Sequence, residues 1–265
     1  MGSKIRAIII VAVTGCLLVN AIVAYAQEVL VPIAATISLE KTVITQGEPV
    51  VLNITFVNAS PRGVVVNLGS EDEKLDVTVV DPAGRVLQRP GRRPRQGWAA
   101  VDAFNVVGGA TSVGYVSLNE WFTFDRVGPY QVEVNLSPLS FPKEPFAYNI
   151  SGNRATLTLT VVPRDETSLA SACADLLKRA KDLHSYSAAL TAARALSSIN
   201  DPVAVPYLAA AAKRKEFASM MIAALARLKT TKAVEALVLV SQSGDPETAA
   251  SARAALTSLG MTVKK

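Results

Sequence analysis

The sequence predicts a multidomain chain, all-β and then all-α: an antiparallel β-sandwich of seven or eight strands followed by an α-solenoid of about three helical hairpins. Apolar residues recur at every second position between residues 36 and 162, whereas after residue 164 they recur at the spacing of a helix face. In the second part, an Ala-Leu step followed three residues later by Ile or Leu occurs at Ala195-Leu196-Ile199, Ala224-Leu225-Leu228 and Ala255-Leu256-Leu259. Its intervals of 29 and 31 residues are typical of helix pairs that stack side by side.

The first 26 residues predict an export signal. Lys4 and Arg6 precede an uncharged apolar run, and Ala24-Tyr25-Ala26 is a small-x-small cleavage site before Gln27. We therefore expect a signal peptide over residues 1–26 and a periplasmic or extracellular protein.

Two alternatives would keep the chain on a membrane. Val13-Thr14-Gly15-Cys16 resembles a bacterial lipobox, which would lipidate Cys16, although apolar residues rather than a polar tether follow it. The uncharged segment 7–26 is also about long enough to span a bilayer uncleaved.

Composition limits the classes of partner and cofactor. The chain has 27 basic and 22 acidic residues, and loss of Lys4 and Arg6 with the signal lowers its net charge from +5 to +3, which is too little to indicate nucleic acid. Cys173 would then be the single cysteine, so no intrachain disulfide can form. The chain also has a single histidine, so one Cys and one His cannot supply the N and S ligands of a zinc site. We therefore expect no cofactor.

Residues 27–163 show the alternation of half-buried strands. The apolar sets are Leu52/Ile54/Phe56, Leu75/Val77/Val79, Tyr130/Val132/Val134/Leu136 and Ala155/Leu157/Leu159/Val161. Turn signals such as Gln46-Gly47-Glu48 and Asp81-Pro82-Ala83-Gly84 separate these sets, as in an antiparallel sandwich.

Two short motifs in this part resemble the immunoglobulin-like modules that are common in exported bacterial proteins. They are Gly47-Glu48-Pro49, which leads into an alternating strand ending at Asn58, and Gly128-Pro129-Tyr130-Gln131-Val132. The resemblance implies an immunoglobulin-like sandwich with Tyr130 as its corner tyrosine.

Residues 164–265 predict six helices. Asp165, Asp201 and Asp245 are placed as N-caps, and Gly244 and Gly260 suit helix ends. The expected ranges are 166–182, 186–199, 202–213, 216–229, 231–242 and 246–259.

The helical part resembles short HEAT-like repeats of the PBS-lyase type. The resemblance is carried by residues 200–208, from Asn-Asp-Pro to Tyr-Leu, and by 245–260, from Asp-Pro to Leu-Gly. Leu177, Leu208 and Leu237, spaced 31 and 29 residues apart, would occupy one position in the second helix of successive hairpins. The sequence departs from the family pattern at two places. The turn 229–232 lacks Asp-Pro, and Ala250 stands where the family often has Arg.

The sequence contains no recognisable catalytic constellation, and we expect a protein that is not an enzyme. His184, the single histidine, falls in a predicted turn beside Asp182, and Cys173 falls on the apolar stripe of its helix, where a thiol is buried and inert. The acidic residues 71–73 with Asp76 match no calcium-loop spacing and indicate a solvated loop.

One segment suggests a contact for an anionic partner. Pro and Gly exclude a helix or a central strand between residues 89 and 98, so four guanidinium groups would project from a loop, where Trp98 could stack on one of them. The candidate contact residues are Arg89, Arg92, Arg93, Arg95 and Trp98. A solvated loop is the alternative.

These features favour an exported, non-catalytic binding or scaffold protein, in which the stacked helices hold a protein partner and the sandwich acts as a spacer or second contact. The alternative is an exported inhibitor or regulator of an envelope enzyme that presents the loops 89–98 and 138–153. The sequence does not indicate an oligomeric state.

Overall fold

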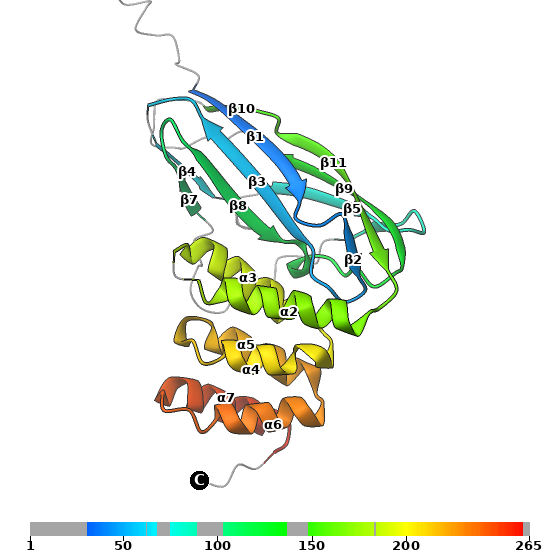
Figure 1. Cartoon of the computed structure of the whole chain (residues 1–265), viewed down its shortest axis with the longest axis vertical. Coiled ribbons are helices and arrows are strands. Elements are labelled where there is room, and N and C mark those ends of the chain that lie inside the picture. The colour runs from blue at the N-terminus through cyan, green and yellow to red at the C-terminus, as the bar shows by residue number, and fades with distance from the viewer. Residues whose placement is uncertain are drawn as a thin grey trace, which may run out of the picture.

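The computed structural model of the protein describes residues 31–61, 63–67, 75–88, 103–136, 148–182 and 184–261. A region of β-sheets comes first, and six α-helices follow it (Figure 1). The helices lie at one end of the sheets in three layers.

The β-region contains two packed sheets, here called sheet A and sheet B. Sheet A has the order β10 (Tyr148–Ser151), β1 (Val31–Leu39), β3 (Val51–Asn58) and β8 (Thr111–Ser117). Sheet B has the order β2 (Val43–Thr45), β11 (Arg154–Val162), β9 (Gly128–Leu136), β5 (Leu75–Val80) and β6 (Val86–Leu87). The strands β4 (Val64–Asn67) and β7 (Ala103–Val106) form a separate two-stranded sheet. A 3-10 turn, η1 (Leu118–Glu120), follows β8.

The core of the sandwich is made by the alternating residues of both sheets, because side chains alternate between the two faces of a strand. Ile54 and Phe56 from sheet A and Val79, Tyr130 and Val132 from sheet B are all fully buried in one cluster. The four alternating sets that the sequence indicates face this core, which confirms the predicted sandwich.

The strand pairing differs from the expected antiparallel arrangement at two places. Among the described residues there are eleven strands rather than seven or eight, and β1 pairs with β10 and β2 with β11 in parallel. The cause is a switch of sheets: after β1, the three residues 40–42 carry the chain across from sheet A, so that β2 joins sheet B. Alternation along a strand reports which face is buried and says nothing about its neighbours.

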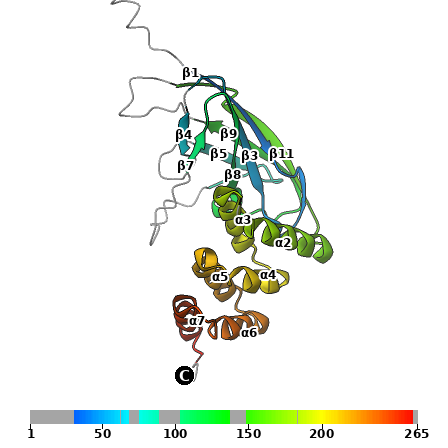
Figure 2. The same cartoon turned by 60° about the vertical axis from the view of Figure 1, so that its left-hand side comes forward.

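The six helices agree closely with the predicted ranges. They are α2 (Glu166–Ala180), α3 (Tyr186–Ser198), α4 (Val205–Ala211, preceded by the 3-10 turn η2, Pro202–Ala204), α5 (Lys215–Leu228), α6 (Thr231–Val240) and α7 (Pro246–Ser258). Figure 2 shows them as the layers α2/α3, α4/α5 and α6/α7. Within the described parts of the chain, no helix is both long and apolar enough to cross a membrane.

The pairing of the helices corrects one prediction. Leu177, Leu208 and Leu237 lie in α2, α4 and α6, which are the first helices of the three layers and not the second. In α2 the buried leucines are Leu169 and Leu176, whereas Leu177 is only partly covered. The repeating Ala-Leu steps lie in the second helices, where Leu196, Leu225 and Leu256 are fully buried.

The helix starts are capped as the sequence predicts. Asp165 accepts a hydrogen bond from Ser168 N at 2.6 Å, and Asp245 accepts one from Thr248 N at 2.8 Å. The turn that lacks Asp-Pro uses another residue, because Thr230 Oγ1 accepts from Ala233 N at 3.2 Å and caps α6.

Candidate binding surface and the junction that supports it

The predicted anionic-partner contact lies outside the described residues. Arg89, Arg92, Arg93, Arg95 and Trp98 all fall in the segment 89–102, and Cys16 falls in the segment 1–30. These contacts therefore stay predictions.

The two residues considered for chemistry have ordinary surroundings. The side chain of His184 is 97% exposed, and its Nδ1 lies 2.7 Å from Asp182 Oδ1. Burial, the main cause, raises the pKa of the Cys173 thiol to about 12, with Asp201 and Glu48 adding to the effect, so the thiol stays protonated at neutral pH. In the described ranges, no group of three or more His, Cys, Asp or Glu side chains could hold a metal ion.

The chain passes from the sandwich to the helices over a short link that Thr45 fastens. Thr45 Oγ1 donates to the carbonyl oxygen of Pro163 at 3.0 Å and accepts from the backbone N–H of Asp165 at 2.7 Å. One hydroxyl of β2 thus satisfies two backbone groups between β11 and α2, and it fixes the direction in which α2 leaves the sheet.

The edge of β2 is closed by Glu48. Its carboxylate accepts from Thr45 N at 3.2 Å and lies 2.5 Å from Lys41 Nζ, while the N–H of Glu48 donates to Thr45 O at 2.9 Å. Beside it an open hollow of about 510 Å³ separates β2 from the first turn of α2. Because the outward groups of Thr45 are occupied, this edge cannot take a further strand there.

Two ion pairs join the helical stack to the sandwich. Arg179 Nη1 on α2 lies 2.6 Å from Glu40 Oε1 at the end of β1, and its guanidinium lies 5.8 Å from the ring centroid of Tyr115. Arg194 Nε on α3 lies 3.6 Å from Glu120 Oε1 in η1. The partners are 139 and 74 residues apart in the chain, so no sequence pattern links them.

Apolar contacts complete the junction. Val51, at the start of β3, belongs to the buried core of the helices and not to that of the sandwich. Tyr115 packs against the same core, and its carbonyl oxygen accepts from Thr191 Oγ1 of α3 at 3.3 Å. The helical core therefore extends onto sheet A, and the first layer of helices and the sandwich form one packed unit.

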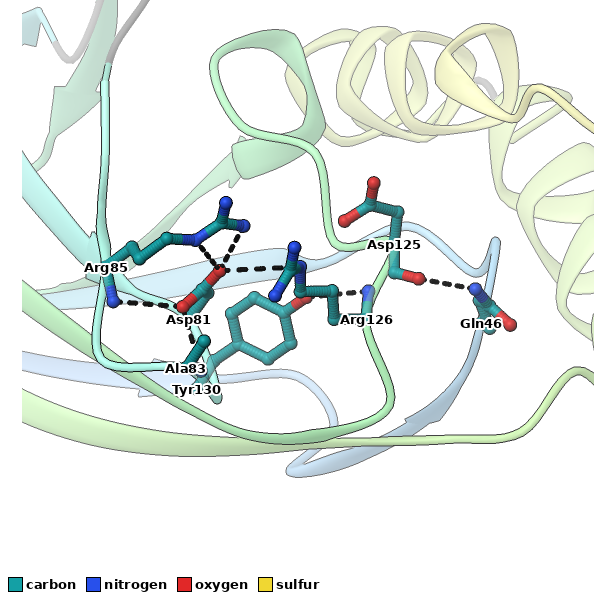
Figure 3. A network of polar contacts seen from close by, with 7 residues as sticks. All are labelled: Gln46, Asp81, Ala83, Arg85, Asp125, Arg126 and Tyr130. Atoms are coloured by element: carbon teal, nitrogen blue, oxygen red, sulfur yellow. Dashed lines mark hydrogen bonds and ion pairs between the residues drawn. The ribbon is translucent and has the colours of Figure 1, made fainter.

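A buried carboxylate organises the end of sheet B beside the junction (Figure 3). The Asp81 side chain is 1% exposed, and its Oδ2 accepts from Arg85 Nε at 2.9 Å and Nη2 at 2.6 Å. Its Oδ1 accepts from the backbone N–H groups of Ala83 and Arg85, and Arg126 Nε lies 3.7 Å from Oδ2. The hydrogen bond from Arg85 is the main reason that the pKa of Asp81 is lowered, so the group is a carboxylate at neutral pH.

Tyr130 closes the same network from within the core. Its hydroxyl oxygen accepts from the backbone N–H of Arg126 at 2.9 Å, four residues upstream, and its ring lies edge-on to Phe124 with centroids 5.3 Å apart. Gln46 donates to the carbonyl oxygen of Asp125, which ties the turn before β9 to the turn after β2. The Tyr130 hydroxyl thus holds the backbone of the turn before β9, and the network has a structural role.

Sequence reasoning recognised Asp81 only as part of a turn. The signal that could have identified it is Asp81 followed four residues later by Arg85, because that spacing lets the arginine return to the carboxylate across the turn. Its burial depends on the distant residues around it and is not encoded locally.

The last layer of helices presents the most exposed large apolar side chain among the described residues. Leu239 on α6 is 69% exposed, and Met261, just beyond α7, is 46% exposed. Val238 and Leu259 on this layer are only partly covered. Among the described helices, the α6/α7 layer is therefore the candidate contact surface.

Comparisons with known proteins assign no family. No family model and no curated protein matches the chain. Among solved structures, a β-glucosidase from Listeria innocua in complex with laminaribiose is 13% identical, with a TM-score of 0.29 over 50% of this chain and 16% of that chain. The alkylpurine DNA glycosylase AlkC from Pseudomonas fluorescens is 15% identical, with a TM-score of 0.26 over 48% of this chain and 30% of that chain.

The sporulation control protein Spo0M from Bacillus subtilis is 10% identical, with a TM-score of 0.28 over 55% of this chain and 54% of that chain. The chain thus spans less than two thirds of each of these proteins. Similarities at this level assign neither a family nor a function. The described part of the chain has a two-sheet sandwich followed by six helices.

Proposed function

We propose that the chain is an exported, non-catalytic protein that binds a protein partner through the last layer of its helical stack, with the sandwich as a rigid support and second contact. The observation that carries the proposal is the exposure of Leu239 on the terminal helix pair. An exposed aliphatic side chain on a rigid helix can enter a partner's pocket at little cost in conformational entropy. The expectation of no nucleic acid partner stays part of the proposal.

We also propose that the two parts are an immunoglobulin-like module and short HEAT-like repeats. The contact between Tyr130 and the Arg126 backbone supports the first, since it has the form of a tyrosine corner. Three helix layers with Asp201-Pro202 and Asp245-Pro246 at helix starts support the second.

The proposal is tested by cross-linking in the envelope of the cells that produce the protein. A photoreactive residue at position 239 should give one cross-linked partner, and the same residue at Val86, which is 55% exposed on β6 of the sandwich, should give none. Cross-links of equal yield from both positions would contradict a binding site on the helical stack. The absence of cross-links from both positions would contradict it as well.

Export rests on the signal predicted over residues 1–26, and the candidate anionic contact rests on residues 89–98. The alternative function, an inhibitor that presents loops 89–98 and 138–153, depends on segments of which only 148–153 is described. No contact in the described residues favours it over partner binding.

A further inference from the structure

The outer face of sheet A carries no charge over nine neighbouring positions. The register of β1, β3 and β8 places these residues in three rows, and their side chains alternate with those that enter the core. The rows are Ala34/Val57/Thr111, Thr36/Thr55/Val113 and Ser38/Asn53/Tyr115. Six of the nine residues are exposed, including Val57 at 45% and Val113 at 40%, and the other three are half-buried.

The outer face of sheet B provides a matched comparison. The register of β5, β9 and β11 gives the rows Val80/Gln131/Thr158, Thr78/Glu133/Thr156 and Asp76/Asn135/Arg154. Three of these nine positions are charged, which is about the share expected for a protein surface that faces water. Sheet A therefore departs from the ordinary solvated surface, and sheet B does not.

The uncharged face of sheet A borders a part of the same sheet that the helices already cover. Below the row Ser38/Asn53/Tyr115 the next pair is Val51 and Ser117, and Val51 is buried in the core of the helices. At this border Arg179 is already paired with Glu40 and lies 4.0 Å from Asp175. Arg179 is thus already engaged, and none of the nine positions offers an opposite charge to a charged partner.

We propose that the part of this face that the helices leave open, residues 34, 36, 38, 53, 55, 57, 111 and 113, is a self-association surface on which a second copy of the chain packs sheet to sheet. Tyr115 lies at its border, where it already packs against the helical core. A two-fold contact sets the same patch against itself, and an uncharged patch can do this without opposing like charges. Thr55 is at the centre of the nine positions, so a two-fold axis through the centre brings it close to its own copy. The inference is independent of the function proposed for the helical stack.

The size of the face sets the strength of the contact. Three strands about 4.8 Å apart, with same-face residues about 6.8 Å apart along each, cover about 300 Å² on each copy. About 600 Å² in total is half of what a stable interface buries, so we expect a reversible dimer with a dissociation constant on the order of 100 µM.

The test is sedimentation velocity of the purified protein from about 5 to 500 µM. We expect the wild-type chain to shift from monomer to dimer across this range, Thr55→Lys to weaken the dimer at least tenfold, and the control Thr156→Lys, on sheet B, to change it less than twofold. A wild-type chain that stays monomeric at every concentration overturns the proposal and leaves the face to a different occupant. Equal weakening by both variants overturns it as well.

A second measurement does not depend on how well a lysine is tolerated. In a Cys16→Ser background, Thr55→Cys should form a disulfide-linked dimer under mild oxidation, because the buried Cys173 cannot compete. The control Thr156→Cys should remain monomeric. No cross-link at position 55, or cross-linking of both variants to the same extent, contradicts packing through sheet A.

Discussion

At the scale of single residues, Asp81 makes the clearest prediction about pH. Its pKa is lowered in the folded protein, so its contribution to stability is present above the unfolded value of 3.8 and is lost as the pH falls through the lower folded value. Asp81→Asn should lower the Tm by several degrees at pH 7, and the difference should shrink as the pH falls through the folded pKa, because the wild-type carboxylate then becomes protonated. Thermal denaturation of both proteins over this range checks it, and a pH-independent difference would contradict the assignment.

Gly152, in the turn between β10 and β11, makes the clearest prediction about packing. Its φ is +69°, and a Cβ at this position would lie 2.2 Å from the carbonyl oxygen of Ala35. Gly152→Ala should cost about 2–4 kcal/mol, from the left-handed backbone and the clash together. Gly84→Ala is the control, because its φ is +76° but no atom lies within 4 Å, and it should cost about 1 kcal/mol. Urea denaturation measures both, and equal losses would exclude the clash.

Among the helices, Lys229 stands at the end of α5 in the left-handed region, with φ 52° and ψ 20°. A glycine avoids the steric cost of this conformation, so Lys229→Gly should raise the free energy of unfolding by up to about 1 kcal/mol. Ala223→Gly, on the exposed side of the same helix, should lower it by about 1 kcal/mol. Loss of stability in both variants would show that α5 does not end as described.

The elements also show what the sequence could and could not predict. All six helices were predicted from an apolar period near 3.6, and the Asp caps marked the starts of α2, η2 and α7. The parallel partners of β1 and β2 were not, because alternation identifies the buried face of a strand and not its neighbour. The junction was also missed, since Arg179 and Glu40 are 139 residues apart and meet only in the folded chain. The candidate surface around Leu239 was not predicted, because the apolar period of α6 gives the exposure of each side chain only approximately.

For the whole molecule, Thr45 is expected to control how firmly the helical stack is held. Thr45→Val removes the hydrogen bonds to Pro163 and Asp165 and leaves both backbone groups without their partner. This should cost about 1–3 kcal/mol and speed trypsin cleavage after Arg164, in the link itself. Thr156→Val, on the outer face of sheet B, should change neither quantity. Unchanged cleavage in Thr45→Val would show that the hydroxyl does not fasten the link.

The central claim is that a rigid sandwich supports a helical stack whose last layer binds a protein. Once the cross-linked partner has been identified and purified, its dissociation constant can be measured by calorimetry against the wild-type chain, Leu239→Glu and the control Val86→Glu. We expect Leu239→Glu to weaken binding by at least tenfold, because a carboxylate would be buried in an apolar contact, and Val86→Glu to leave binding within twofold. Equal affinities for the wild-type chain and Leu239→Glu would contradict the claim.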